Sequence, residues 1–215
     1  MGLVFPELTT ARLRLRPFTP EDAEGLAALH GDPRVMRFVD DGRPVPPEEV
    51  RTRTLPALLA QYRELPEGFG HRAAVARDSG EFLGWFEFGP VGSVGLHGGP
   101  GVVELGYRLL PGVWGRGLAT EGARALVEHG FAELGVRRVV ATTMSVNAAS
   151  RRVLEKTGLT WVRTFFVDWP EPLPGAEHGE VEYALTRGEW ARARESRRPG
   201  TAGTAGVAPA TGPQS

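Results

Sequence analysis

The segment LLPGVWGRGLATEGARALVEHGF, residues 109–131, crowds a proline and three glycines directly before a strongly helical run. A helix start leaves four backbone N–H groups unpaired and carries about half a positive charge from the helix dipole. Glycines ahead of it let the backbone approach a ligand that a Cβ would push away. The segment therefore predicts either a loop that binds phosphate or pyrophosphate, or a tight turn between a strand and a helix.

Several other chemistries lack their motifs in this sequence. There is no G-x-x-x-x-G-K-[ST] loop and no G-x-G-x-x-G in a βαβ setting, which disfavours nucleotide triphosphatases and dinucleotide oxidoreductases. No G-x-S-x-G elbow supports a serine hydrolase. The chain has no cysteine, and its five histidines lack metal-ligand spacing, so we expect no metal. A net charge of −1 gives no general attraction to nucleic acid.

The 215-residue chain is predicted to form one domain, residues 1–195, followed by a low-complexity tail, residues 196–215. The tail has no acidic residue and almost no large apolar one, so we expect it to be disordered. The start of the sequence lacks the features of a signal peptide, and no apolar run approaches the ~20 residues that span a bilayer. We therefore expect a cytoplasmic protein with no membrane partner.

Residue patterns along the chain predict a mixed α/β domain in the order β-α-α-β-β-β-α-β-α-β-β, with a last helix from Thr186. Thr19 and Pro20 begin the first helix, and a second is expected over Pro47–Glu64 with a kink or break at Pro56. The predicted strands cover residues 11–18, 71–77, 81–89, 102–110, 137–144, 159–167 and 180–186.

A second stretch, VNAASRRVLEKTGL (Val146–Leu159), follows the strand after the glycine segment. Together with ELGYRLLPGVWGRGLATEG it resembles the GCN5-related N-acetyltransferase (GNAT) superfamily, and most closely its branch of ribosomal-protein-alanine N-acetyltransferases, the RimJ/RimL type. The resemblance covers nearly the whole chain except the tail. One departure is Trp114, which stands where the glycine motif of the superfamily usually has Arg or Gln.

The resemblance implies a mostly antiparallel mixed sheet with helices on both faces and a V-shaped splay between strands 102–110 and 137–144. The pantetheine arm of acetyl-CoA, the cosubstrate, would enter the gap, and its pyrophosphate would sit on the glycine loop. The residues implied to bind it are Leu109, Leu110, Arg116, Gly117, Leu118, Ala119, Thr120, Asn147 and Ser150. Asn147 is equally a plausible N-cap of its helix.

The resemblance also implies direct acetyl transfer within a ternary complex. Glu104 is the first candidate for the base that deprotonates the amine, ahead of Glu87 and then Asp168. Ser150 is the candidate acid for the leaving thiolate, because Leu154 stands where many members carry a tyrosine. For these residues a plain structural role, on a strand face or a helix surface, is the alternative.

The acceptor is expected to be a primary amine, either a protein N-terminus or a small molecule such as a polyamine, amino sugar or amino acid. Use of a longer acyl-CoA, and a non-catalytic acyl-CoA sensor, are the alternatives, and exposed strand edges leave room for a homodimer. The residues expected near the acceptor are Asp40, Asp41, Asp168, Glu171 and Glu177, with Trp85, Trp161 and Trp169 as lining or core.

Overall fold

The computed structural model describes residues 6–168 and 171–197, and its elements follow the predicted order with two short additions, β1 and α2. The strands are β1 (Leu8–Thr9), β2 (Leu13–Arg16), β3 (Gly70–Ala76), β4 (Phe82–Gly89), β5 (Val102–Leu109), β6 (Arg138–Met144), β7 (Thr160–Phe165) and β8 (Glu180–Thr186). The helices are α1 (Ala23–His30), α2 (Pro33–Met36), α3 (Pro47–Glu49), α4 (Leu55–Glu64), α5 (Leu118–Ala132), α6 (Ala148–Thr157) and α7 (Arg187–Arg197).

The strands form one sheet in the order β1-β2-β3-β4-β5-β6-β8-β7, in which every pair is antiparallel except β5–β6. That parallel pair lasts only from Val102↔Arg138 to Glu104↔Val140. Beyond it, β5 stays paired with β4 as far as Leu109, while β6 stays paired with β8 as far as Met144. The two central strands therefore separate, and the predicted splay is confirmed.

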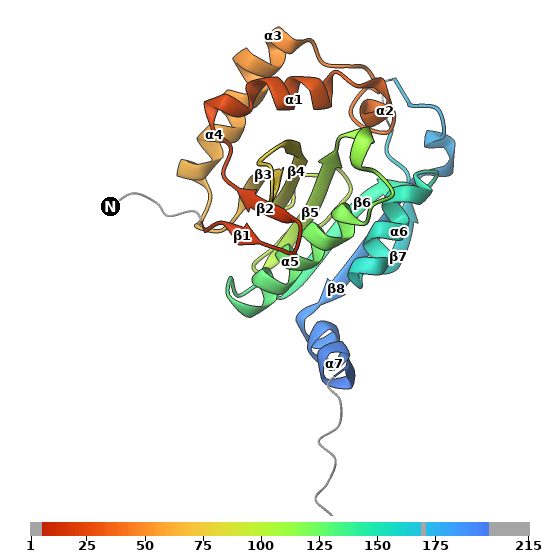
Figure 1. Ribbon diagram of the computed structural model, residues 1–215. Coiled ribbons are helices and arrows are strands. Elements are labelled where there is room, and N and C mark those ends of the chain that lie inside the picture. The colour runs from red at the N-terminus through yellow and green to blue at the C-terminus, as the bar shows by residue number, and fades with distance from the viewer. Residues whose placement is uncertain (1–5, 169–170, 198–215) are drawn as a thin grey trace, which may run out of the picture.

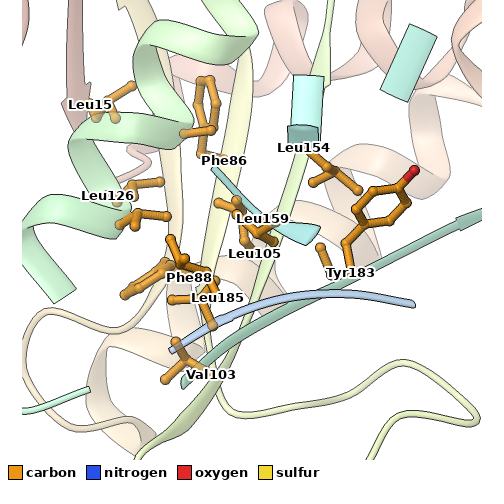
Figure 2. Packing of buried hydrophobic residues seen from close by; sticks show 14 of the residues in the cluster. Leu15, Phe86, Phe88, Val103, Leu105, Leu126, Leu154, Leu159, Tyr183 and Leu185 are labelled. Carbon is orange, nitrogen blue, oxygen red and sulfur yellow. The ribbon is translucent and has the colours of Figure 1, made fainter. Parts of the chain in front are cut away.

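Helices cover both faces of the sheet (Figure 1). On one face, α1 and α4 bury Leu26 and Leu58 against Trp85 of β4. On the other face, α5 and α6 pack against Phe86 and the strands beside it. Figure 2 shows this second core, where Leu126 of α5 and Leu154 of α6 meet Phe86, Leu105 and their neighbours. Because successive strand residues point to opposite faces, adjacent residues such as Trp85 and Phe86 serve different cores.

Pro56 perturbs the predicted 47–64 helix without ending it. A proline inside a helix has no N–H to donate, and its ring presses on the carbonyl four residues back. Here the turn before it, Val50–Thr54, is a π-helix, and the N–H of Leu55 reaches back to the carbonyl of Val50. The wider turn accommodates the proline, so α3, the π-helix (η2) and α4 run on in sequence.

The C-terminal helix begins at the predicted capping box. The Glu189 carboxylate accepts from the Thr186 N–H (2.8 Å) and hydroxyl (2.6 Å). Helix α7 then includes residues 196 and 197, which we had expected in the tail, and the rest of the predicted tail lies outside the described residues. No helix in the described part of the chain is both long and apolar enough to cross a membrane.

We expect Gly122→Ala to destabilise the protein by about 1–3 kcal/mol, because a Cβ there would lie 2.3 Å from the Phe86 ring in a filled core. The better helix propensity of alanine, about 1 kcal/mol, offsets only part of this. Gly188→Ala in α7 is the matched control, since its Cβ would meet nothing closer than the flexible end of Arg192 at 3.5 Å. Urea unfolding measures the free energy of unfolding of both variants. Equal stabilisation of the two would contradict this packing.

Candidate active site

Two cavities meet where β5 separates from β6. One, of about 570 Å³, runs from the splayed end of β5 over the glycine loop and along α6. The other, of about 620 Å³, lies under α1, α3 and α4 and the 40–46 loop. Arg108 of β5 lines both cavities. The two cavities therefore adjoin at this residue.

The glycine loop adopts the conformation expected of an anion-binding socket. Gly115 and Gly117 have φ of 73° and 79°, in the left-handed region that favours glycine. A Cβ on Gly115 would enter open space. Glu121, in the first turn of α5, is bonded to Arg12 (2.7 Å), and Arg12 also donates to the Arg116 carbonyl (2.9 Å). The negative charge nearest the helix start is thus neutralised, and the loop is braced by the β1–β2 turn.

Most residues implied by the resemblance line the first cavity. They are Leu109, Gly117, Leu118, Ala119, Thr120, Asn147 and Ser150. Leu110 and Arg116 do not line this cavity, and the Leu110 N–H donates to the Leu83 carbonyl (2.9 Å). Asn147 caps α6 by accepting from the Ser150 N–H (3.1 Å), and it also lines the cavity. Its position is therefore compatible with both roles, helix cap and cosubstrate contact.

The unusual Trp114 has a definite place at this site. Its indole N–H donates to the Leu109 carbonyl (2.7 Å), and the side chain lines the first cavity although 48% of it is exposed. The bond fixes the end of β5 to the glycine loop. The tryptophan thus stabilises the loop where the usual motif has a charged or amide side chain.

Besides Arg108, four cationic side chains on the wall of this cavity supply positive charge: Arg34, Arg37, Arg152 and Lys156. Arg152 and Lys156 belong to the stretch Val146–Leu159, whereas Arg34 and Arg37 lie outside every motif of the sequence. Arg152 and Lys156 are four residues apart on α6, so their shared helix face was the available signal. Arg34 and Arg37 belong to a segment with no phosphate-binding pattern, and the fold alone brings them here.

The splay leaves one edge of β5 without a strand partner. Ladder bonds alternate along an antiparallel pair, and the Leu110 N–H donates toward β4. The backbone groups of Tyr107 and Leu109 therefore face away from β4, into the gap, where the Leu109 carbonyl already accepts from the Trp114 indole N–H. They are suited to bind an extended arm as an added strand would.

Ser150 has a hydroxyl partner that the sequence did not indicate. The Tyr107 hydroxyl lies 3.0 Å from Ser150 Oγ and donates to the Ser150 carbonyl (3.1 Å). Both residues line the first cavity. Burial, partly offset by the bond to Ser150, raises the pKa of Tyr107, so the phenol stays protonated at neutral pH. The tyrosine absent from position 154 thus has a counterpart on β5, 43 residues away from Ser150.

The second cavity has a polar floor whose histidines are neutral. Burial, followed by the charge of Arg108, lowers the pKa of both His30 and His71 to about 4. The indole N–H of Trp85 donates to Nε2 of His30 (3.1 Å), and Nδ1 of His71 pairs with Gln61 Oε1 (2.9 Å). These bonds fix the rings in place.

Glu87 is the acidic residue on this floor, and its environment favours the protonated form. Burial, and then the nearby Glu104 carboxylate, raises the pKa of Glu87 to about 7. Its carboxylate lies 3.7 Å from Nε2 of the neutral His71. It also leans over Gly106 of β5, where a Cβ would come within 3.1 Å of Oε2. A carboxyl group half ionised near neutral pH is well matched to accept a proton there.

Glu104, the first candidate base from sequence, lines neither cavity. It sits where β5 and β6 are still paired, and is buried. Its carboxylate accepts from the N–H groups of Gly92 and Ser93 (2.9 Å each) and from the Ser93 hydroxyl. Since these bonds fill the carboxylate and anchor the loop after β4, the contacts of Glu104 are structural, whereas Glu87, the second candidate, lines the second cavity.

The other residues expected near the acceptor separate into two groups. Asp40, Asp41 and Trp85 line the second cavity, whereas Asp168, Glu171, Glu177 and Trp161 do not. Glu171 touches its rim through Arg43 (3.3 Å). Trp169 lies outside the described residues. Within residues 6–168 and 171–197, no group of His, Asp and Glu side chains is arranged to hold a metal ion.

Comparison with known proteins agrees with this geometry. A family model described as an acetyltransferase (GNAT) domain matches residues 12–160. The chain is 42% identical over 190 residues to the FsC-acetyl coenzyme A-N(2)-transacetylase of Aspergillus fumigatus, covering 87% of this chain and 79% of that protein. It is 26% identical to the crystal structure of an acetyltransferase from Agrobacterium tumefaciens, with a TM-score of 0.64 over 86% of this chain and 96% of that one.

A third likeness, to RimL, the ribosomal L7/L12 alpha-N-protein acetyltransferase in complex with coenzyme A, has a TM-score of 0.67 over 84% of this chain and 98% of that one. At 19% identity it shows the fold alone, so the expected RimJ/RimL-type branch is not established. The family match, the related transacetylase and the two adjoining cavities agree on one identity. The chain belongs to the GNAT acetyltransferase family and is an N-acetyltransferase that uses acetyl-CoA.

Proposed function

We propose that the protein transfers the acetyl group directly to a primary amine of a small molecule held in the second cavity. The observation that carries this proposal is the partly buried Glu87 on the floor of that cavity, next to the splayed end of β5. A volume of about 620 Å³ is in the range of small-molecule sites. The name of the Aspergillus relative assigns its acetyl group to a nitrogen designated N(2), which supports a defined amine as the acceptor.

In this proposal, acetyl-CoA supplies the thioester from the first cavity. Its phosphates would lie on the amides of Gly117, Leu118 and Ala119 and near the cationic side chains of α2 and α6. The backbone edge of β5 at Tyr107 and Leu109 would hold the arm. Glu87 would take the proton that the acceptor ammonium must lose before it attacks. Ser150 would donate a hydrogen bond to the departing sulfur.

A screen with purified protein tests the proposal. Release of free thiol from acetyl-CoA is followed against a panel of small primary amines and a matched panel of peptides with free N-termini, and products are weighed by mass spectrometry. We expect turnover with small amines, each product gaining one acetyl group on nitrogen. Turnover confined to peptides would overturn the small-molecule acceptor while leaving the N-acetyltransferase assignment intact.

We expect Tyr107→Phe to lower kcat about 5- to 10-fold with little change in the KM for acetyl-CoA, because the phenol orients Ser150 through one hydrogen bond. Steady-state kinetics on Tyr107→Phe, Ser150→Ala and the double variant measure this. If Tyr107 acts through Ser150, the double variant is no slower than Ser150→Ala alone. Additive losses would contradict the coupling.

A further inference from the structure

Arg108 stands out because it lines both cavities, yet its hydrogen bonds are poor. Its side chain is 18% exposed. Within the described residues its bonds are long: Nη1 to Met36 Sδ at 3.8 Å and Nη2 to Asp40 Oδ2 at 3.4 Å. A guanidinium has five N–H donors, and leaving them poorly matched in a buried site is costly. The arrangement is suited to a ligand oxygen that would complete the site.

The position of Arg108 relative to Glu87 indicates what that ligand looks like. Trp85 pairs with Arg108 and Glu87 pairs with Gly106, so Glu87 and Arg108 are diagonal neighbours on the same face, roughly 7 Å apart at their backbones. Gly106, between Arg108 and Glu104 on that face, adds no side chain to separate them. The guanidinium also stacks over Trp85 at 5.1 Å, which fixes its direction.

The two groups therefore present a proton acceptor and a cation side by side. From this we propose that the acceptor is an amine with a carboxylate on the neighbouring carbon, an α-amino acid or a compound ending in one, whose carboxylate pairs with Arg108. The inference rests on the proposed function and names its substrate class. A carboxylate can accept two parallel, charge-assisted hydrogen bonds from the planar guanidinium of an arginine.

Charge also disfavours the other small amines named above. A polyamine or amino sugar would bring a second positive charge toward Arg108, with repulsion in a partly buried site. The other acidic side chains of the cavity do little to cancel it. Asp40 is 66% exposed and already faces Arg108, Asp41 is exposed and accepts from the Arg43 N–H (3.0 Å), and Glu49 pairs with Arg53 (3.1 Å). Asp40 holds φ at 52°, a left-handed backbone conformation that is uncommon outside glycine but that Asp adopts more readily than most residues.

The test uses matched acceptors that differ in the carboxylate alone: lysine with 1,5-diaminopentane, phenylalanine with 2-phenylethylamine, and serine with 2-aminoethanol. We measure kcat/KM for each with wild type, Arg108→Gln and Asp40→Asn. In wild type we expect at least a tenfold preference for the carboxylate member of every accepted pair. Arg108→Gln should reduce that ratio about 10- to 100-fold, and any loss that comes from removing the charge that lowers the pKa of Glu87 should fall on both members alike. Asp40→Asn should increase it, because the competing carboxylate is gone.

Each other outcome overturns the inference in a recognisable way. Equal losses on both members of a pair in Arg108→Gln would mean a structural role or a role at the thioester. A wild-type preference for decarboxylated amines would overturn the carboxylate and leave the small-molecule proposal standing. Amino acid amides accepted as well as the acids would overturn the need for negative charge. Acetylation of peptides and no small amine would overturn both proposals together.

Discussion

Glu87→Gln is expected to lower kcat/KM for the acceptor by about 10²- to 10⁴-fold, the usual contribution of a positioned general base. The variant replaces the carboxylate by an isosteric amide that cannot take a proton from the ammonium. Acetyl-CoA binding should be unchanged, because Glu87 does not line the first cavity. Stopped assays of thiol release, with calorimetric titration of acetyl-CoA, measure the two effects separately.

The pH profile gives this prediction a second readout. The pKa of Glu87 is raised to about 7 by burial and by Glu104, so below that pH the carboxyl is protonated and cannot act as a base. The kcat/KM of wild type should therefore fall tenfold per pH unit below about 7 and level off above it. In Glu87→Gln the break near pH 7 should disappear, and the small remaining activity should keep rising with pH through and above that range, because only the neutral amine can then attack.

Glu104→Gln is the matched control, one strand away on the same face but outside both cavities. It removes a negative charge that raises the pKa of Glu87, so the acid limb should move to lower pH while the plateau is kept. If Glu104→Gln instead abolishes turnover in a folded protein and Glu87→Gln does not, the roles of the two glutamates are reversed.

This choice of base shows where sequence reasoning reached its limit. Alternation along the strands and the glycine signal were enough to predict the strands and the loop at the start of α5, and the family resemblance implied the splay. Glu87 and Glu104 both point to the same face, and nothing local separates them. What separates them is the loop after β4, which folds back so that Gly92 and Ser93 satisfy Glu104. Such a contact is set by tertiary packing.

The same limit applies to the hydroxyl pair and the arginine. Tyr107 and Ser150 meet because β5 and α6 pack on one face, and Leu154 occupies the core where a tyrosine was expected. In the sequence, Arg108 is one of many arginines and lies in an ordinary strand pattern. The position of Arg108 becomes informative only in the folded chain, where β5 separates from β6 and the arginine side chain lines both cavities.

The glycine loop gives the second large effect. We expect Gly117→Trp to weaken acetyl-CoA binding by at least about 100-fold, because the indole would project from the start of α5 into the cavity and cover amides that bind the pyrophosphate. Its Cβ alone would meet nothing closer than Arg12 Nη2 at 3.6 Å, so the fold can accept the change. The left-handed φ of 79° adds a backbone cost of about 1–2 kcal/mol.

Two control variants distinguish loss of binding because the indole fills the site from loss of binding because the substitution strains the backbone. Gly112→Trp places the same bulk in the same loop, outside the cavity and with open space around its Cβ. Gly135→Trp imposes the strain alone, at φ 68° with open space and away from both cavities. Calorimetric titration should give near-wild-type acetyl-CoA binding for both and a loss for Gly117→Trp, with Gly117→Trp and Gly135→Trp losing similar stability. Undiminished binding in Gly117→Trp would mean that these glycines only shape the turn and that the pyrophosphate is held elsewhere, by the arginines of α2 and α6.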